Sequence, residues 1–250
     1  MLAPNTKVAL FIPCYTEQIF PETGMALATL LRHFGMQPIH VQHQTCCGQP
    51  AFNTGYRDLA IPLAERFLRL FEPYEWIVAP SGSCVSMVKV FYGKLDLSKA
   101  GRERWEKIRH RIFEGTQFIY HQLGIKSIGG RFEGRVAMHE SCHARRELGI
   151  REEPRVLLQS ISGLDLVIPP GAEECCGFGG TFAVKFPELS TAIGLDKLSA
   201  IQSTGAQLIT ALDDSCLMHL HGLLRRRGQE LRSLHALRIM AGALNLNDRK

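Results

Sequence analysis

Apolar runs of two lengths alternate along the chain and predict an α/β fold. Short runs such as Val8–Pro13 and Glu75–Ala79 have the length and apolar content of buried strands. Longer segments such as Pro21–Phe34 and Asn53–Phe71 place apolar residues at helical spacing. Strands that alternate with helices are typical of parallel sheets. The chain is therefore expected to form parallel sheets covered by helices.

The same scheme occurs twice. In the first half the predicted strands are 8–13, 38–41 and 75–79, and the predicted helices are 21–34, 53–71 and one from about Val85. In the second half the predicted strands are 136–139, 166–168 and 206–211, and the predicted helices are 154–162, 187–203 and 217–227, followed by a C-terminal helix over 233–244. One or two further helices are predicted between the halves, over 98–123.

Residue identities also repeat between the halves, which indicates a duplication. Val8–Cys14 aligns with Val136–Cys142 at an offset of 128 residues, and Ile77–Cys84 aligns with Ile209–Cys216 at an offset of 132. The sequence therefore predicts two Rossmann-like αβ domains, at 1–97 and 134–250, that are joined by a helical connector at 98–133.

All eight cysteines of the chain belong to this repeat. Each half has a single cysteine, then an adjacent pair followed by glycine, then another single cysteine. The first set is Cys14, Cys46, Cys47 and Cys84, and the second set is Cys142, Cys175, Cys176 and Cys216. Every cysteine follows a predicted strand or lies in the loop after it, and ligands of α/β sheets collect at the carboxyl ends of strands. We expect each set of four thiols to meet at one point.

Four clustered thiols point to a bound metal centre. Thiolates repel one another, and thiols form only weak hydrogen bonds, so a cation or a cluster would stabilise the group. Four cysteines bind either an iron–sulfur cluster or zinc. Structural zinc sites usually pair their ligands as C-x₂₋₄-C, which is absent from this chain. This spacing favours iron–sulfur and leaves zinc open, while buried apolar cysteines are the structural alternative.

Composition and charge narrow the function classes only slightly. The 250 residues carry a formal net charge of +5, without a nucleic-acid-binding motif, so no nucleic-acid partner is expected. No apolar run approaches the roughly 20 residues of a membrane span, and the N-terminus does not resemble a signal peptide. We therefore expect a cytoplasmic protein, where patterned cysteines more often bind metals or carry redox chemistry than form disulfides.

Six motifs give the chain a family resemblance. They are Phe11–Cys14, Thr45–Pro50, Pro80–Cys84, His139–His143, Glu174–Gly180 and Asp213–Cys216. In these stretches the chain resembles the cysteine-rich Cys-Cys-Gly domain family, which includes the B subunit of heterodisulfide reductase and the iron–sulfur subunits of anaerobic glycerol-3-phosphate dehydrogenase and glycolate oxidase. Within that family it is most similar to the lactate utilization A branch, whose members have two such domains.

The resemblance implies a function and partners. It implies a cytosolic iron–sulfur subunit of an oxidoreductase complex that oxidises L-lactate to pyruvate, with lactate utilization proteins B and C as partners. No flavin or nicotinamide motif is evident in the chain, so an electron-relay or docking role is expected, and the catalytic residues are unknown. A zinc-stabilised scaffold without a redox role is the alternative, and thiol–disulfide chemistry on a bound substrate is a third hypothesis.

One departure from the family pattern affects the expected cofactor. The fuller pattern ends each domain in C-x-x-C, but this chain has Ser81 and Asp213 in place of the first cysteine of each pair. Four thiols per domain remain, which suffices for a [4Fe–4S] cluster, with one or two clusters per chain. We expect Asp213 to cap the helix that follows it, with an oxygen ligand as the alternative.

Four further polar residues lie near the first cysteine of a set, one of them near Cys14 and three near Cys142. His139 and His143 lie beside Cys142, and they are expected either to donate to cluster sulfur or relay protons, or to be ordinary core or surface histidines. Glu17 and Glu140 lie near the first cysteines and are interpreted as solvated carboxylates, with acid–base chemistry as the alternative.

Overall fold

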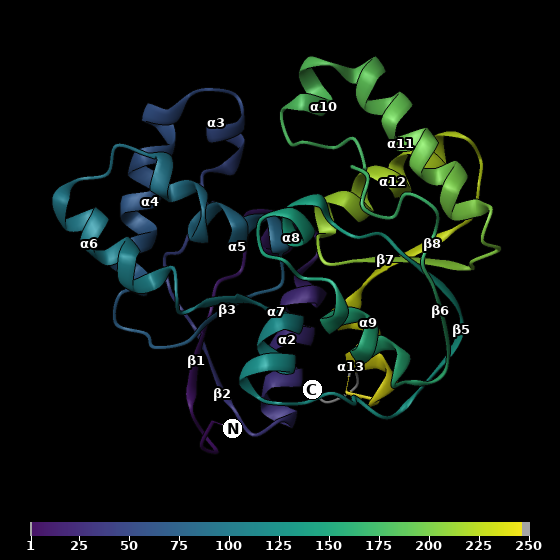
Figure 1. Ribbon diagram of the computed structural model, residues 1–250, viewed down its shortest axis with the longest axis horizontal. Helices are drawn as coiled ribbons and strands as arrows, with labels where there is room; N and C mark the ends of the chain where they lie inside the picture. The colour runs from purple at the N-terminus through teal and green to yellow at the C-terminus, as the bar shows by residue number, and fades with distance from the viewer. Residues whose placement is uncertain (1, 247–250) are drawn as a thin grey trace. The chain divides into compact units, whose positions relative to one another are not determined.

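The computed structural model describes residues 2–246, and the chain divides into two compact units between Gly124 and Ile125. Each unit is a four-stranded parallel sheet with helices, so the predicted α/β class and the two similar halves are confirmed (Figure 1). None of the helices within residues 2–246 combines the length and the apolar composition that a membrane span needs.

The first unit has the strand order β2-β1-β3-β4, with every neighbouring pair parallel. The strands are β1 (Lys7–Leu10), β2 (Gln37–His40), β3 (Ile77–Ala79) and β4 (Ile112–Glu114). Leu10 at the end of β1 pairs with His40 on one side and with Val78 on the other. The three strands therefore end at almost the same level, and the loops that follow them start side by side.

Helices connect these strands across both faces of the sheet. They are α1 (Cys14–Ile19), α2 (Pro21–His33), α3 (Gln49–Asn53), α4 (Arg57–Phe71), α5 (Gly82–Lys89), α6 (Lys99–Ile108) and α7 (Gly115–Gln117), with a 3₁₀ turn at Phe91–Lys94 and a π turn at Phe118–Gln122. Helix α2 lies on one side of the strands, and α4 and α6 lie on the other (Figure 1). This arrangement follows from right-handed crossovers in a sheet whose order reverses direction at β1.

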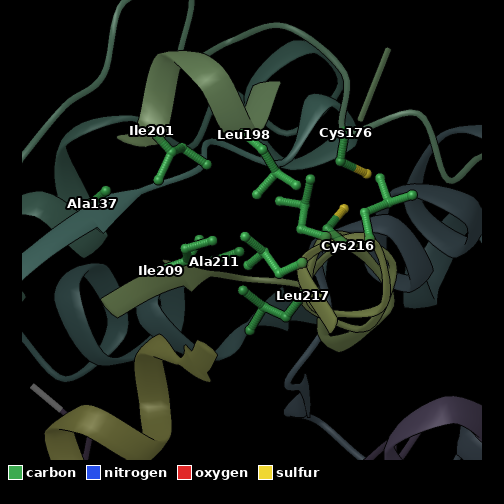
Figure 2. Close-up of a cluster of buried hydrophobic side chains, with 11 residues drawn as sticks. Ala137, Cys176, Leu198, Ile201, Ile209, Ala211, Cys216 and Leu217 are labelled. Atoms are coloured by element: carbon green, nitrogen blue, oxygen red, sulfur yellow. The ribbon is translucent and has the colours of Figure 1, made fainter. Parts of the chain in front are cut away.

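The second unit repeats the order as β6-β5-β7-β8, again all parallel. Its strands are β5 (Arg131–Met138), β6 (Ser162–Val167), β7 (Leu208–Ala211) and β8 (Arg232–His235). Its helices are α8 (Cys142–Arg146), α9 (Glu152–Gln159), α10 (Phe182–Lys185), α11 (Pro187–Gln202), α12 (Asp214–Arg226) and α13 (Ala236–Ala243). Strands β5 and β7 pack against α11 and α12 through an apolar cluster that includes Ala137, Leu198, Ile209 and Leu217 (Figure 2).

Two short edge strands differ from the sequence prediction. The segment predicted as a helical connector contains helix α6, but it also contains β4, which pairs with β3 in the first sheet. The predicted C-terminal helix begins later than expected, at Ala236, because 232–235 form β8 beside β7. Residues 112–114 contain only two consecutive apolar residues and 232–235 only one apolar residue, so neither segment has the apolar run that located the central strands.

Candidate metal centres

The first unit brings its four cysteines together from three loops at the carboxyl end of the sheet. Cys14 is the first residue of α1, shortly after β1. Cys46 and Cys47 lie in the loop between β2 and α3, and Cys84 is the third residue of α5, after β3. The position predicted from the strand ends is therefore the position that the structure shows.

The four thiols form a continuous series of sulfur–sulfur contacts. Hydrogen bonds join Cys14 to Cys46, Cys46 to Cys47, and Cys47 to Cys84. Cys47 is buried, and the other three are partly exposed. All eight cysteines of the chain, each within the described residues, are free thiols.

Cys46 is the thiolate of this group. Hydrogen bonds from the thiols of Cys14 and Cys47, together with the backbone N–H of Gly48, lower the pKa of Cys46 to about 3. The same contacts raise the pKa of Cys14 and Cys47 well above the ordinary value, with burial as a further cause. One negative charge is thus shared by several sulfur atoms, and a bound cation would favour release of the remaining protons.

Backbone geometry and polar side chains fix the Cys-Cys-Gly loop. Gly48 has a φ of +86°, and its N–H lies 3.4 Å from the Sγ of Cys46. The Gln44 side chain accepts from the N–H of Ile12 over 2.8 Å, which ties the loop to the end of β1. The buried hydroxyl of Tyr92 donates to the carbonyl of Cys47 over 2.9 Å. The loop is therefore held from both of its sides.

The second unit has the same arrangement of thiols. Cys142 is the first residue of α8, Cys175 and Cys176 lie between β6 and α10, and Cys216 is the third residue of α12. Hydrogen bonds join Cys142 to Cys175, Cys175 to Cys176, and Cys176 to Cys216. The sulfur atoms of Cys176 and Cys216 point toward each other at one end of the apolar cluster (Figure 2).

Cys175 is the corresponding thiolate. Hydrogen bonds from Cys142 and Cys176, and from the N–H of Gly177, lower the pKa of Cys175 to about 2. The pKa of Cys142 and that of Cys176 are both raised, first by their hydrogen bonds to Cys175 and then by burial. Both units therefore have their thiolate at the first cysteine of the adjacent pair.

His139 distinguishes the second unit from the first. Its side chain is fully buried, and within residues 2–246 neither ring nitrogen has a hydrogen-bond partner. A ring nitrogen of His139 and the Sγ atoms of Cys176 and Cys216 all lie within 4.8 Å of one another. Burial, and then the charge of Lys197, lower the pKa of His139 to about 3, so the imidazole is neutral. Neutral imidazole is the form that binds metal ions.

The two glutamates near the first cysteines, Glu17 and Glu140, differ in burial. Glu17 is exposed, as expected of a solvated carboxylate. The same interpretation was wrong for Glu140, which is buried and forms ion pairs with Arg145 and Arg155. His143 is adjacent to the site, with its Nδ1 3.6 Å from the Sγ of Cys142.

The two residues that replace the family cysteine both occupy helix N-cap positions. The Ser81 hydroxyl accepts from the N–H of Cys84 over 3.3 Å, so it caps α5. Asp213 stands at the N-cap of α12, but its carboxylate accepts no capping hydrogen bond from that helix, so the expected side-chain cap was wrong. Its negative charge instead contributes to the raised pKa of Cys142.

Lys197 is a residue of the second site that the sequence interpretation missed. It is only 1% exposed, and its ammonium donates to the carbonyl of Gly171. Burial lowers the pKa of Lys197; the charges of Glu174 and Glu173, followed by those of Cys176 and Cys175, act in the opposite direction. The sequence prediction gave only a helix over 187–203, and the burial of Lys197 on that helix became visible in the structure.

Comparison with known proteins places this geometry in a family. The family model of a cysteine-rich domain, CCG, matches residues 8–89 and again 136–221, so each match contains one complete set of four cysteines. The chain belongs to the CCG cysteine-rich domain family. The two matched segments correspond to the two structural units, as the duplication predicted.

Two relatives match almost the whole chain. Lactate utilization protein A 2 of Bacillus cereus is 39% identical over 242 residues, which are 96% of this chain and 99% of that protein. Lactate utilization protein A of Oceanobacillus iheyensis is 38% identical, over 94% of this chain and 96% of that protein. The predicted resemblance to the lactate utilization A branch is therefore confirmed.

Among solved structures, a hypothetical protein from Helicobacter pylori has the same fold. Its TM-score is 0.64 at 12% identity, and the match covers 99% of this chain. The chain spans about half the length of that protein, since the match covers 50% of it. At this identity the likeness concerns the fold alone.

Proposed function

We propose that this CCG protein is the iron–sulfur subunit of a complex that oxidises L-lactate to pyruvate in the cytoplasm. The observation that carries the proposal is the pair of thiol series, Cys14–Cys46–Cys47–Cys84 and Cys142–Cys175–Cys176–Cys216, each joined by three hydrogen bonds. The subunit would relay electrons or dock a partner, and the lactate-binding residues would belong to another component.

The donor set fits an iron–sulfur cluster in each unit. Sulfur is the ligand that such clusters require, and four cysteines suffice for a [4Fe–4S] cluster. Adjacent cysteines suit a centre with several metal atoms, because neighbouring thiolates can bind different atoms. In the first unit these ligands would be Cys14, Cys46, Cys47 and Cys84. When bound, a cluster of this type accepts or donates one electron at a time.

Residues around the thiols would tune such a cluster. The N–H groups of Gly48 and Gly177 donate to the sulfur atoms of Cys46 and Cys175 over 3.4 and 3.3 Å. Hydrogen bonds to sulfur and exclusion of water are two of the factors that set the potential of a cluster. The burial of Cys47 and Cys176, each 2% exposed, keeps water from one side of each site.

Lactate is the substrate that the relatives support. Proteins named lactate utilization protein A match over nearly their full length. Oxidation of L-lactate to pyruvate releases two electrons and two protons, so a one-electron carrier would take the electrons singly and pass them to an external electron acceptor. Lactate utilization proteins B and C are the expected partners.

The test is lactate-dependent reduction of the complex. The full chain is purified without oxygen, mixed with the lactate utilization proteins B and C of the same organism, and its visible spectrum is followed after L-lactate is added. We expect bleaching of the cluster absorption with all three proteins and none when lactate is omitted. A colourless protein, or a spectrum that lactate does not change in the three-protein mixture, would contradict the proposal.

A zinc-stabilised scaffold without a redox role is the second candidate. The proximity of His139, Cys176 and Cys216 favours it, since zinc binds combinations of sulfur and imidazole nitrogen. Stoichiometric zinc without acid-labile sulfide, and unfolding by a chelator, would support the scaffold in place of the electron carrier.

A further inference from the structure

Helix α4 of the first unit and helix α11 of the second can be aligned residue by residue. The buried positions of α4 and of α11 share an offset of 130 residues along the chain. The five aligned pairs are Ala60 and Ser190, Ala64 and Gly194, Phe67 and Lys197, Leu68 and Leu198, and Phe71 and Ile201. The offset of 128 residues that aligns β1 with β5 likewise makes Phe11 the residue of the first unit that corresponds to His139 of the second.

In the first unit these positions are filled by aromatic side chains. The rings of Phe11 and Phe67 contact edge to face, with centroids 4.8 Å apart. Phe71 completes the group, at 5.7 Å from Phe11 and 4.4 Å from Phe67. These three buried rings form an apolar aromatic cluster in the first unit.

In the second unit the same two positions are His139 and Lys197. The strand before His139 remains apolar, since Val136, Ala137 and Met138 are all buried as in β1. Two buried polar groups thus replace an aromatic pair in an otherwise similar frame. Burial of polar groups is unfavourable unless they find partners.

The side chains of His139 and Lys197 do not form a hydrogen bond with each other. Lys197 donates to the carbonyl of Gly171. The backbone N–H of His139 donates to the carbonyl of Thr210 over 2.8 Å, which fixes the position of the residue. Within residues 2–246 the ring nitrogens have no hydrogen-bond partner, and one of them is within 4.8 Å of two thiol sulfur atoms. A metal ion bound to those sulfur atoms would satisfy the imidazole.

We infer that His139 is a metal ligand in the second unit, binding through a ring nitrogen together with Cys176 and Cys216. The first unit then has an all-cysteine centre and the second a mixed cysteine–histidine centre. The inference rests on the proposed function only in that the second unit holds a metal; it is independent of whether that metal is iron in a cluster or zinc. Lys197 would partly offset the negative charge of the bound thiolates.

The experiment detects the nitrogen ligand directly. The full-length Cys46→Ser/Cys47→Ser chain is purified without oxygen to restrict metal to the second site, and X-ray absorption is recorded at the edge of the metal that it contains. We expect a nitrogen scatterer at a bonding distance, about 2.0–2.1 Å if the metal is zinc. Selective ¹⁵N labelling of histidine should change the nitrogen coupling in pulsed EPR when the metal centre is paramagnetic.

Three variants assign the nitrogen signal to a residue. His139→Phe installs the residue of the first unit and should remove the nitrogen signal, whereas the control His143→Phe should retain it. His139→Cys should exchange nitrogen for sulfur and keep the metal, which preserves the test if the phenylalanine variant does not fold. A nitrogen signal that persists without His139, or a metal-loaded site without any histidine nitrogen, would overturn the inference.

Failure of this inference is distinguishable from failure of the proposed function. Clusters in both units without a histidine nitrogen would overturn only the role of His139. Zinc with a histidine nitrogen, and no sulfide, would overturn only the iron–sulfur assignment. A second unit that binds no metal would overturn the role of His139, and a chain that binds no metal in either unit would overturn both.

Discussion

The backbone N–H of Gly177 lies 3.3 Å from the Sγ of Cys175, in a turn where Gly177 has a φ of +88°. Gly48 and Cys46 have the same relationship in the first unit, at 3.4 Å and a φ of +86°. The glycine of each Cys-Cys-Gly motif therefore serves two purposes, since it forms the turn and donates a hydrogen bond to the thiolate.

Alanine substitutions should separate the backbone cost from the steric cost at this turn. A Cβ at Gly177 would lie 2.5 Å from the carbonyl oxygen of Ser190, whereas a Cβ at Gly48 would make ordinary contacts with Ala60. We expect Gly48→Ala to destabilise the fold by about 1–2 kcal/mol, the cost of a left-handed conformation, and Gly177→Ala to destabilise it more. Denaturant unfolding of both variants measures the difference; equal losses would contradict this account of the packing.

The metal-free protein should react selectively with alkylating agents at low pH. The pKa of Cys46 is lowered to about 3 and that of Cys175 to about 2, so both are thiolates at pH 5, while Cys14 and Cys142 have raised pKa values and stay protonated. Because the thiolate is the nucleophile, brief treatment with iodoacetamide should modify Cys46 and Cys175 first. Peptide mass spectrometry reads the order, and equal labelling of Cys14 would refute it.

Glu140 should stabilise the second unit through its two arginines. It is buried and pairs with Arg145 on α8 and Arg155 on α9, so Glu140→Gln removes the charge while keeping the size of the side chain. We expect a loss of about 1.5–3 kcal/mol, the range for hydrogen bonds to charged groups. The exposed Glu17 provides the control, since Glu17→Gln should change the unfolding free energy by less than about 0.5 kcal/mol.

The buried hydroxyl of Tyr92 should contribute to the position of the first cysteine loop. It donates to the carbonyl of Cys47, and Tyr92→Phe would leave that carbonyl without this bond. A loss of about 1 kcal/mol is expected on denaturant unfolding. Since the ring itself is retained, the metal content of the variant should equal that of the wild type; a fall in metal content would assign Tyr92 a larger role.

Much of this arrangement was predictable because it depends on local pattern. Apolar runs located the central strands of both sheets, and the rule that strand ends collect ligands placed Cys14, Cys47 and Cys84 together. Glycine follows each cysteine pair in the sequence, and both glycines have a positive φ in the structure. These features are set by residues close in sequence, so a pattern along the chain is enough to reveal them.

Other features depend on residues that are distant in sequence. Glu140 was misinterpreted because its burial depends on Arg155, on a different helix. The unsatisfied imidazole of His139 became visible only when the structure placed Cys176 and Cys216 beside it. Edge strands such as β8 depend on a neighbouring strand for their hydrogen bonds and have little signal of their own.

The central claim is that each unit binds its own metal centre through its set of cysteines. The most direct test measures iron, zinc and acid-labile sulfide per chain in the wild type, in Cys47→Ser, in Cys176→Ser and in the double variant, all purified without oxygen. We predict about four irons and four sulfides per unit in the wild type, a loss of about half in each single variant, and almost none in the double variant, with all four proteins folded. Metal and sulfide content that the substitutions leave unchanged would contradict the claim.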